Sequence, residues 1–319
     1  MKKSIILLGI ILIMGGTFAQ QVSYRVLKSS NKLPVFQLGL VASTLETSFS
    51  FKNLDLLQVN AGPGIDARLH LSNILHVRAN GYVAKYVDMQ NWFAYDETLR
   101  LENVDEMDNS RAYAYDLGVE FTPFVKKSNN SPIPVTLKSK DISRTMAEVT
   151  TINAKGKAAS FFGFRGGLTR YRTNFGGNLT TEDGTVFRDH YATLRGNALY
   201  AGVTWGAASY VKIFANGYGT KEGGGLTKIY ADVMFGPESN VEMVQGGQTY
   251  KIVASEEVNF GENALGFRMG VELTSIKTVG FGVVMEGGVK PGYGSMPYFR
   301  LDFQLPLINI GRLEGKEKS

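Results

Sequence analysis

The sequence predicts an all-β protein, a single antiparallel up-and-down β-barrel that spans a membrane. Three observations predict it: an N-terminal export signal, many runs of alternating apolar and polar residues, and connections that alternate between short and long. Successive side chains of a strand point to opposite faces, so alternation indicates a sheet with one apolar and one polar face.

Residues 1–19 have the three parts of a secretory signal peptide. Lys2 and Lys3 give a basic start, residues 4–14 form an apolar core, and small residues lead to a cleavage site after Ala19. The core is shorter than the roughly 20 apolar residues of a transmembrane helix. We therefore expect export to the outer membrane of a Gram-negative bacterium.

The strands are clearest in the C-terminal third, where Leu265, Phe267, Met269, Val271 and Leu273 alternate with small or charged residues. We expect about twelve strands, with about ten to fourteen consistent with the pattern, because tilted membrane strands need about 9–11 residues each. The predicted runs are residues 35–51, 56–71, 74–87, 111–124, 158–172, 193–205, 209–219, 226–235, 248–258, 265–273, 279–290 and 299–307. A soluble periplasmic β-sandwich is the structural alternative, since its strands alternate too.

These runs divide the mature chain into a periplasmic N-terminal segment at 20–34, a barrel at 35–309 and a polar tail at 310–319. With the N-terminus in the periplasm, the expected short periplasmic turns are Ser72-Asn73, Gly206-Ala207 and Ser275-Ile276. Residues 89–110 and 173–192 are expected as long outside loops, the usual arrangement in outer-membrane barrels.

Residues 125–157 form a long basic segment on the predicted periplasmic side. Such a segment is suited to binding an acidic periplasmic protein, and a solvated loop is the alternative. Its length also leaves room for an extra hairpin, which is one reason why ten, twelve or fourteen strands stay open.

The composition excludes several classes of function. The chain has no cysteine, so neither a disulfide nor a thiolate metal site is available. A net charge of +5 is too small to indicate a nucleic-acid partner. We expect no cofactor and no bound metal, and outer-membrane lipid is the predicted surrounding.

Charged residues at the polar positions of the strands are expected to face one lumen and to form a network there. Mixed signs favour arginine–carboxylate pairs across a narrow interior, whereas an aqueous channel becomes usual at about 16–18 strands. The predicted network consists of Arg68, Arg78, Asp116, Glu120, Arg165, Arg268, Glu272, Glu286, Arg300 and Asp302.

The histidines are the first candidates for chemistry. His70 and Ser72 resemble the His-x-Ser-Asn pattern of outer-membrane lipid hydrolases, in which a histidine base activates a serine two residues away. Ser72-Asn73 is also a favoured tight-turn pair, and the turn is the preferred interpretation. His70 and His76 flank this turn as a candidate metal pair without a recognisable third ligand, and His190 has no identifiable partner.

An acidic stretch at residues 96–108 is a further candidate, for calcium, although it matches no EF-hand spacing and a solvated loop is preferred.

The residues LGFRMGVE at 265–272, GFG at 280–282 and PYFRLDF at 297–303 resemble the ends of outer-membrane β-barrel proteins of Bacteroidetes, and FAQQ at 18–21 resembles their signal-peptide exit. The resemblance implies a barrel inserted by the envelope assembly machinery, and it carries over no catalytic residue. One departure is that a polar tail at 311–319 follows the last strand, where many barrels end on an aromatic residue.

Three functions follow from these observations. The first is a non-catalytic structural or partner-binding component of the envelope, the second is a narrow channel for small solutes, and the third is a lipid hydrolase.

Overall fold

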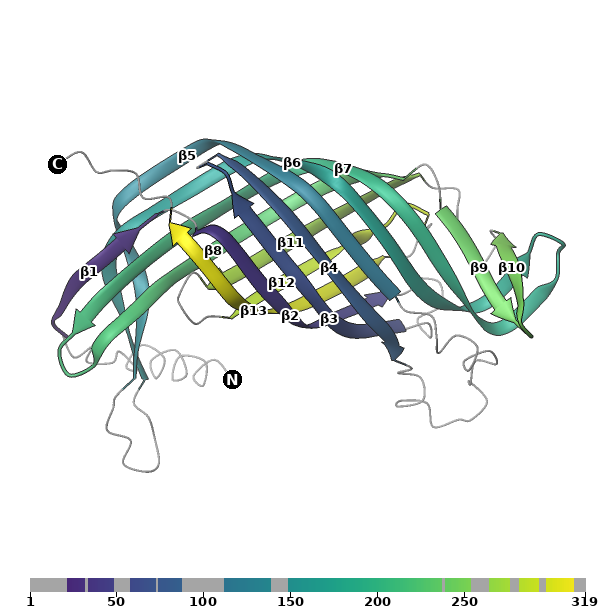
Figure 1. Cartoon of the computed structure of the whole chain (residues 1–319), viewed down its shortest axis with the longest axis horizontal. Helices are drawn as coiled ribbons and strands as arrows, with labels where there is room; N and C mark the ends of the chain where they lie inside the picture. The colour runs from purple at the N-terminus through teal and green to yellow at the C-terminus, as the bar shows by residue number, and fades with distance from the viewer. Residues whose placement is uncertain are drawn as a thin grey trace, which may run out of the picture.

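Alternating side chains over most of the chain produce a structure built from strands (Figure 1). The computed structural model describes residues 22–31, 34–48, 58–72, 74–87, 112–138, 149–236, 239–253, 264–275, 281–292 and 297–312. Within these ranges, no helix is long and apolar enough to cross a membrane.

The described strands form one antiparallel sheet. They are β1 (Tyr24–Ser30), β2 (Pro34–Ser48), β3 (Gln58–His70), β4 (Leu75–Val87), β5 (Ala112–Lys138), β6 (Val149–Thr181), β7 (Val186–Ala215), β8 (Gly219–Phe235), β9 (Ser239–Gln245), β10 (Gln248–Val253), β11 (Leu265–Ser275), β12 (Gly282–Val289) and β13 (Tyr298–Arg312).

Ten of these strands close into a barrel, in the order β2-β3-β4-β5-β6-β7-β8-β11-β12-β13. Closure is made by β13 and β2, which pair from Tyr298↔Ser48 to Arg312↔Pro34. Closing the sheet leaves no edge among the ten strands, so their backbone groups are paired within the wall.

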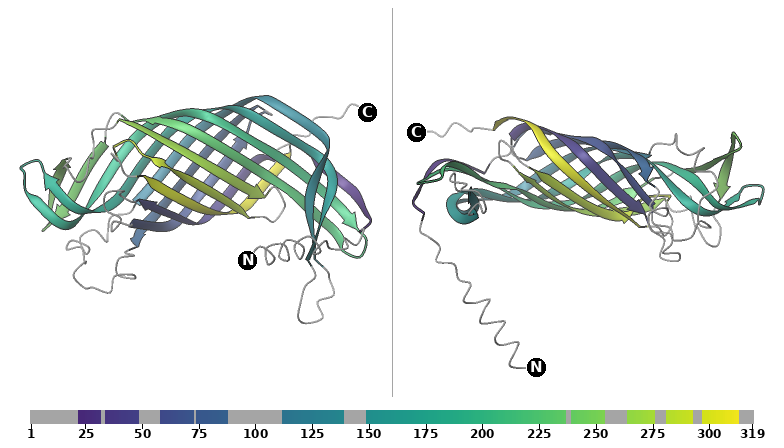
Figure 2. Two further views of the ribbon diagram at one scale, coloured as in Figure 1. Left: turned by 180° about the vertical axis from the view of Figure 1, so that it is seen from behind. Right: turned by 90° about the horizontal axis from the view of Figure 1, so that it is seen from below.

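The remaining three strands lie at the two ends of the barrel (Figure 1 and Figure 2). We call the end where β3 finishes and β4 starts the β3–β4 end, and the end with the turn at 182–185 the β6–β7 end. Strand β1 pairs with the last residues of β7 at the β3–β4 end, where β13 also finishes. The β9–β10 hairpin bridges the start of β7 and the end of β6 at the other end.

The expected count of about twelve barrel strands is not confirmed, and the largest difference lies in β7. The runs 193–205 and 209–219 belong largely to this one strand, so the turn expected at Gly206-Ala207 is wrong. Gly206 pairs with Phe161 on one side and Lys228 on the other. A methyl group on Gly206 would lie 2.5 Å from the Phe161 ring, so this glycine permits close packing within a continuous strand.

Two segments expected as loops are also strands. β5 continues to Lys138 and β6 starts at Val149, so most of 125–157 extends the barrel wall at the β3–β4 end. The expected outside loop at 173–192 is the paired end of β6 and start of β7 around a short turn. Polar composition concealed both extensions, because strand pairing continues beyond the apolar outer surface.

Two further predicted segments differ from the structure in their bounds, and other predicted segments lie outside the described residues. The segment 20–34 contains strand β1, and the run 248–258 is a strand only over Gln248–Val253, outside the ten-strand closure. Two of the twelve predicted runs form the single strand β7, and the run 248–258 lies outside the barrel, so ten barrel strands remain. Because ten is an even number, both ends of the described chain lie at the β3–β4 end. The signal peptide, residues 89–110 and the tail after Arg312 lie outside the described residues.

The burial pattern is the reverse of that in a soluble protein. Charged side chains such as Arg68, Asp232 and Glu272 are buried inside the barrel, while Phe164, Leu168 and many other large apolar side chains are exposed on its outside. Among the described residues, two apolar clusters are buried near the two ends of the lumen.

Candidate functional site

The lumen is the most chemically distinctive part of the molecule. Along β3, Ile65 and Leu69 point outward and Asp66, Arg68 and His70 point inward, and the same alternation continues around the wall. All ten residues expected in the lumen network have buried or nearly buried side chains. Each of them forms an ion pair with another charged residue of the lumen. Their ion pairs form three connected groups.

The first group lies toward the β3–β4 end around Glu272, which is fully buried. Arg68 donates to this carboxylate, Arg78 Nη1 lies 3.3 Å from its Oε2, and Lys228 Nζ lies 3.4 Å from the same oxygen. Asp66 balances the two arginines, with contacts of 2.8 Å to Arg68 Nε and 2.5 Å to Arg78 Nη2.

Glu120 links the first group to the second. Its Oε1 lies 2.9 Å from Lys228 Nζ and 3.7 Å from Arg165 Nη1. Arg165 then contacts Asp232, with 3.1 Å between Nε and Oδ1.

Arg268 is the centre of the second group. It lies 2.6 Å from Asp232, 2.8 Å from Asp116 and 3.8 Å from Glu286, measured between the nearest guanidinium nitrogen and carboxylate oxygen of each pair. One guanidinium therefore joins three strands of the wall from inside.

The third group lies toward the β6–β7 end. Arg300 contacts Asp302 at 3.3 Å and Glu286 at 3.6 Å. Beyond it, Lys290 Nζ lies 2.6 Å from Glu46, whose other oxygen accepts a hydrogen bond from Tyr82.

Buried tyrosines fill the space between the arginines. The Arg165 guanidinium lies 4.0 Å from the centre of the Tyr230 ring, and that of Arg268 lies 4.1 Å from the centre of the Tyr200 ring. Such stacking is attractive because the ring face is electronegative. Tyr230 and Tyr298 also donate hydrogen bonds to Glu286, at 2.7 and 2.8 Å. The lumen is thus packed with charged and tyrosine side chains.

The prediction from the sequence did not include five charged residues of this network. Asp66, Lys228 and Asp232 share the inward positions of predicted strands, so the same alternation was available to find them. Glu46 follows a bulge in β2, which shifts the alternation by one residue. Lys290 lies just past the end of β12, where alternation no longer assigns a face.

Apolar clusters border the charged layer on both sides. At the β6–β7 end, Tyr171, Leu194 and Met243 are among the residues of a buried cluster that reaches into the β9–β10 hairpin. At the β3–β4 end, Phe161 packs on Leu226, and farther out Ile133, Val135 and Val211 join β5 to β7.

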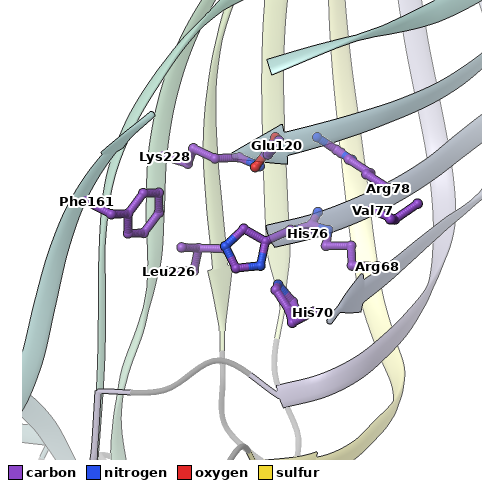
Figure 3. Close-up of a pocket in the computed structure, with 9 residues that line it drawn as sticks. All are labelled: Arg68, His70, His76, Val77, Arg78, Glu120, Phe161, Leu226 and Lys228. Atoms are coloured by element: carbon purple, nitrogen blue, oxygen red, sulfur yellow. The ribbon is translucent and has the colours of Figure 1, made fainter. Parts of the chain in front are cut away.

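A small cavity of about 20 Å³ lies inside the β3–β4 end, with room for about one water molecule (Figure 3). His70 and His76 line it with Glu120 and Lys228, and the two imidazole centres are 4.8 Å apart. The described residues include no group of three potential metal ligands. His190 lies elsewhere, on β7, where its Nδ1 is 2.6 Å from the Arg188 carbonyl oxygen.

Ser72 has a structural role in the β3–β4 turn. Its Oγ accepts hydrogen bonds from the amides of Ile74 at 3.2 Å and Leu75 at 3.0 Å. This is the geometry of a serine-capped turn, whereas Asn73 lies outside the described residues. The acidic stretch at 96–108 lies outside the described residues.

Comparisons with known proteins add little to this geometry. No family model matches the chain, and no curated protein matches it. Among solved structures, a chain described as "Salmonella typhi OmpF complex with Daunomycin" aligns over 87% of this chain and 98% of its own, with 10% identity and a TM-score of 0.19. A TM-score this low carries no argument, so the barrel rests on its own strand pairings.

Proposed function

We propose that this chain is an integral outer-membrane β-barrel with a closed lumen, serving as a structural or partner-binding component of the envelope. The observation that carries the proposal is the reversed burial pattern. Large apolar side chains are exposed around the wall, among them Leu69, Leu117, Phe164, Leu199, Trp205, Val233, Phe267, Met269, Met285 and Phe299. A soluble protein rarely exposes a contiguous apolar surface of this kind, whereas hydrocarbon would surround it favourably.

Closure of the sheet also supports a position of the barrel within the membrane. In lipid every backbone amide and carbonyl group must be paired within the protein, and only a closed barrel of strands achieves this. The export signal at residues 1–19 and the resemblance of the C-terminal strands to Bacteroidetes barrels support an outer-membrane location. With the N-terminus in the periplasm, the β3–β4 end faces the periplasm and the β6–β7 end faces outward.

The filled lumen favours a non-catalytic, non-conducting role. Ion pairs, stacked tyrosines and two apolar clusters occupy the described interior, and we infer from them that no open path crosses the barrel. In the channel alternative these side chains would have to move apart, and conductance would then change when Arg268 or Arg300 is replaced.

A partner surface is offered by the extension of β5 and β6 at the β3–β4 end. Lys126, Lys127, Lys138 and Lys155 are exposed there, and the described part of 125–157 contains no acidic residue. We infer that this extension binds an acidic periplasmic protein, because a cluster of one charge sign attracts the opposite sign.

Two experiments test the proposal separately. Carbonate washing of membranes, together with a heat-dependent gel shift, tests integration, and release of the protein by carbonate would exclude it. Crosslinking in cells then tests the partner. Lys126→Glu/Lys127→Glu/Lys155→Glu should abolish the crosslink, while Lys221→Glu on β8 should preserve it; an unchanged pattern in both would refute the partner surface.

A further inference from the structure

An apolar groove of about 960 Å³ runs across the outer face of the barrel from β2 to β7. Its size lies near the upper limit of ordinary ligand pockets. One row of directly paired residues lies along it, Leu40↔Ile65↔Gly81↔Tyr115↔Arg170↔Asn197. The groove is thus a feature of the wall itself, built from six neighbouring strands.

Small outward residues on two strands make the wall hollow here. Pro63 and Ala67 on β3 and Ala79 and Gly81 on β4 line the groove, where other strands carry large side chains. Larger apolar residues stand around them, including Leu117 and Leu168. The resulting slot is apolar, as an acyl chain requires.

Three arginines gather at the end of the groove nearest the β6–β7 turn. Arg170 lines the groove, Arg172 occupies the next outward position of β6, and Arg195 on β7 is paired directly with Arg172. Like charges at directly opposite positions of a sheet destabilise it. An anion bound between these arginines would therefore reduce their mutual repulsion.

The described residues supply little negative charge to this cluster. Glu242 lies 3.7 Å from Arg195, and its side chain is partly exposed. No described acidic group is paired with Arg170 or Arg172, and the buried Nε of Arg172 has no hydrogen-bond partner among the described residues. The guanidinium groups of Arg170 and Arg172 therefore carry no ion pair among the described residues.

We propose that the groove binds one bilayer lipid with a net-negative phosphate head group, whose phosphate contacts Arg170, Arg172 and Arg195 and whose acyl chain lies along the groove. This inference rests on the proposed membrane location. Arginine suits a phosphate because its planar donors match the phosphate oxygens. Tyr113 and Tyr115, whose ring centres are 5.1 Å apart, flank the arginines at the level where amphipathic rings favour the head-group region.

The test is native mass spectrometry of the detergent-purified barrel, with phosphatidylglycerol or phosphatidylcholine of identical acyl chains added at equal concentration. One retained phosphatidylglycerol per barrel is expected. Arg170→Gln/Arg172→Gln should weaken its retention at least fivefold, since each basic side chain near a membrane surface contributes about that factor. Arg188→Gln, an exposed arginine of the same strand as Arg195, is the matched control and should retain the lipid.

A second variant tests the groove without changing charge. Ala79→Phe places a large ring in the slot and should displace the acyl chain while leaving the gel shift of the folded barrel unchanged. Glycerol phosphate, which has the head-group anion but no acyl chain, should not compete at the same concentration.

The outcomes separate the two proposals. Equal retention of both lipids, or unchanged retention in both the arginine and the Ala79 variants, would overturn the lipid site and leave the membrane barrel intact. A protein that stays soluble without detergent would overturn the membrane barrel itself.

Discussion

Replacing Glu272 by Gln should destabilise the barrel severely, because three cations surround this one carboxylate. Arg68, Arg78 and Lys228 all contact it, and Glu272 is fully buried. At an effective dielectric constant of about 20, a pair 3.3–3.4 Å apart contributes roughly 5 kcal/mol of attraction before desolvation. Breaking a buried pair by removing one partner costs about 3–5 kcal/mol net, since the remaining charges stay buried.

The assay is urea unfolding of the barrel reconstituted in lipid vesicles, followed by the gel shift. Glu182→Gln is the matched control, because Glu182 pairs with Lys251 at 2.5 Å but both side chains are more than half exposed. An exposed pair contributes about 0–1 kcal/mol, so this variant should unfold like the wild type.

The double variant Glu272→Gln/Arg78→Met tests the mechanism, because Asp66 keeps Arg68 as a partner and Lys228 stays paired with Glu120. Removing one excess cation should recover part of the lost free energy of unfolding, as coupling between residues in contact requires. Equal unfolding of Glu272→Gln and Glu182→Gln, or simple additivity in the double variant, would refute the assignment of stability to this charge cluster.

Three further predictions concern the wall and the turn. Val233→Arg, on the outer face, should lower the free energy of unfolding in vesicles by about 2–4 kcal/mol if the residue lies near the middle of the bilayer, and no loss would contradict a lipid-facing position. Gly167→Val should prevent formation of the gel-shifted species because its side chain would collide with the Leu117 carbonyl oxygen, whereas Gly287→Ala, with its nearest neighbour at 3.4 Å, should fold normally. Ser72→Ala should cost about 1 kcal/mol of stability through its lost turn hydrogen bonds and leave ester hydrolysis by the preparation unchanged; loss of hydrolysis would revive the lipid-hydrolase alternative.

Strand faces could be predicted from the sequence wherever large apolar residues alternate with polar ones. On β11, the alternation from Leu265 to Leu273 correctly places Arg268 and Glu272 inside and Phe267 and Met269 outside. The two-residue period of a strand predicts the charged residues of the lumen in the same way, because a strand has only two faces and the outer one is apolar.

Other features depend on contacts that no local pattern contains. Small residues around Gly206 resemble a turn, yet pairing with β6 and β8 on both sides keeps the backbone extended. The polar ends of β5 and β6 are strands because they pair with each other and with β7, although they lack the outer apolar surface. The groove depends on small residues of β3 and β4 becoming neighbours of large residues on β5 and β6, which follows from the register of pairing and not from either strand alone.

Planar-bilayer conductance of the folded protein tests whether the lumen is filled. Arg165→Ser/Arg268→Ser removes two guanidinium groups stacked on Tyr200 and Tyr230 but leaves the apolar clusters at both ends of the lumen in place. We therefore expect no current steps from the wild-type barrel or from the double variant, each shown to be folded by its gel shift. Discrete steps from the wild-type barrel that change when Arg268 or Arg300 alone is replaced would contradict a filled lumen and establish the channel.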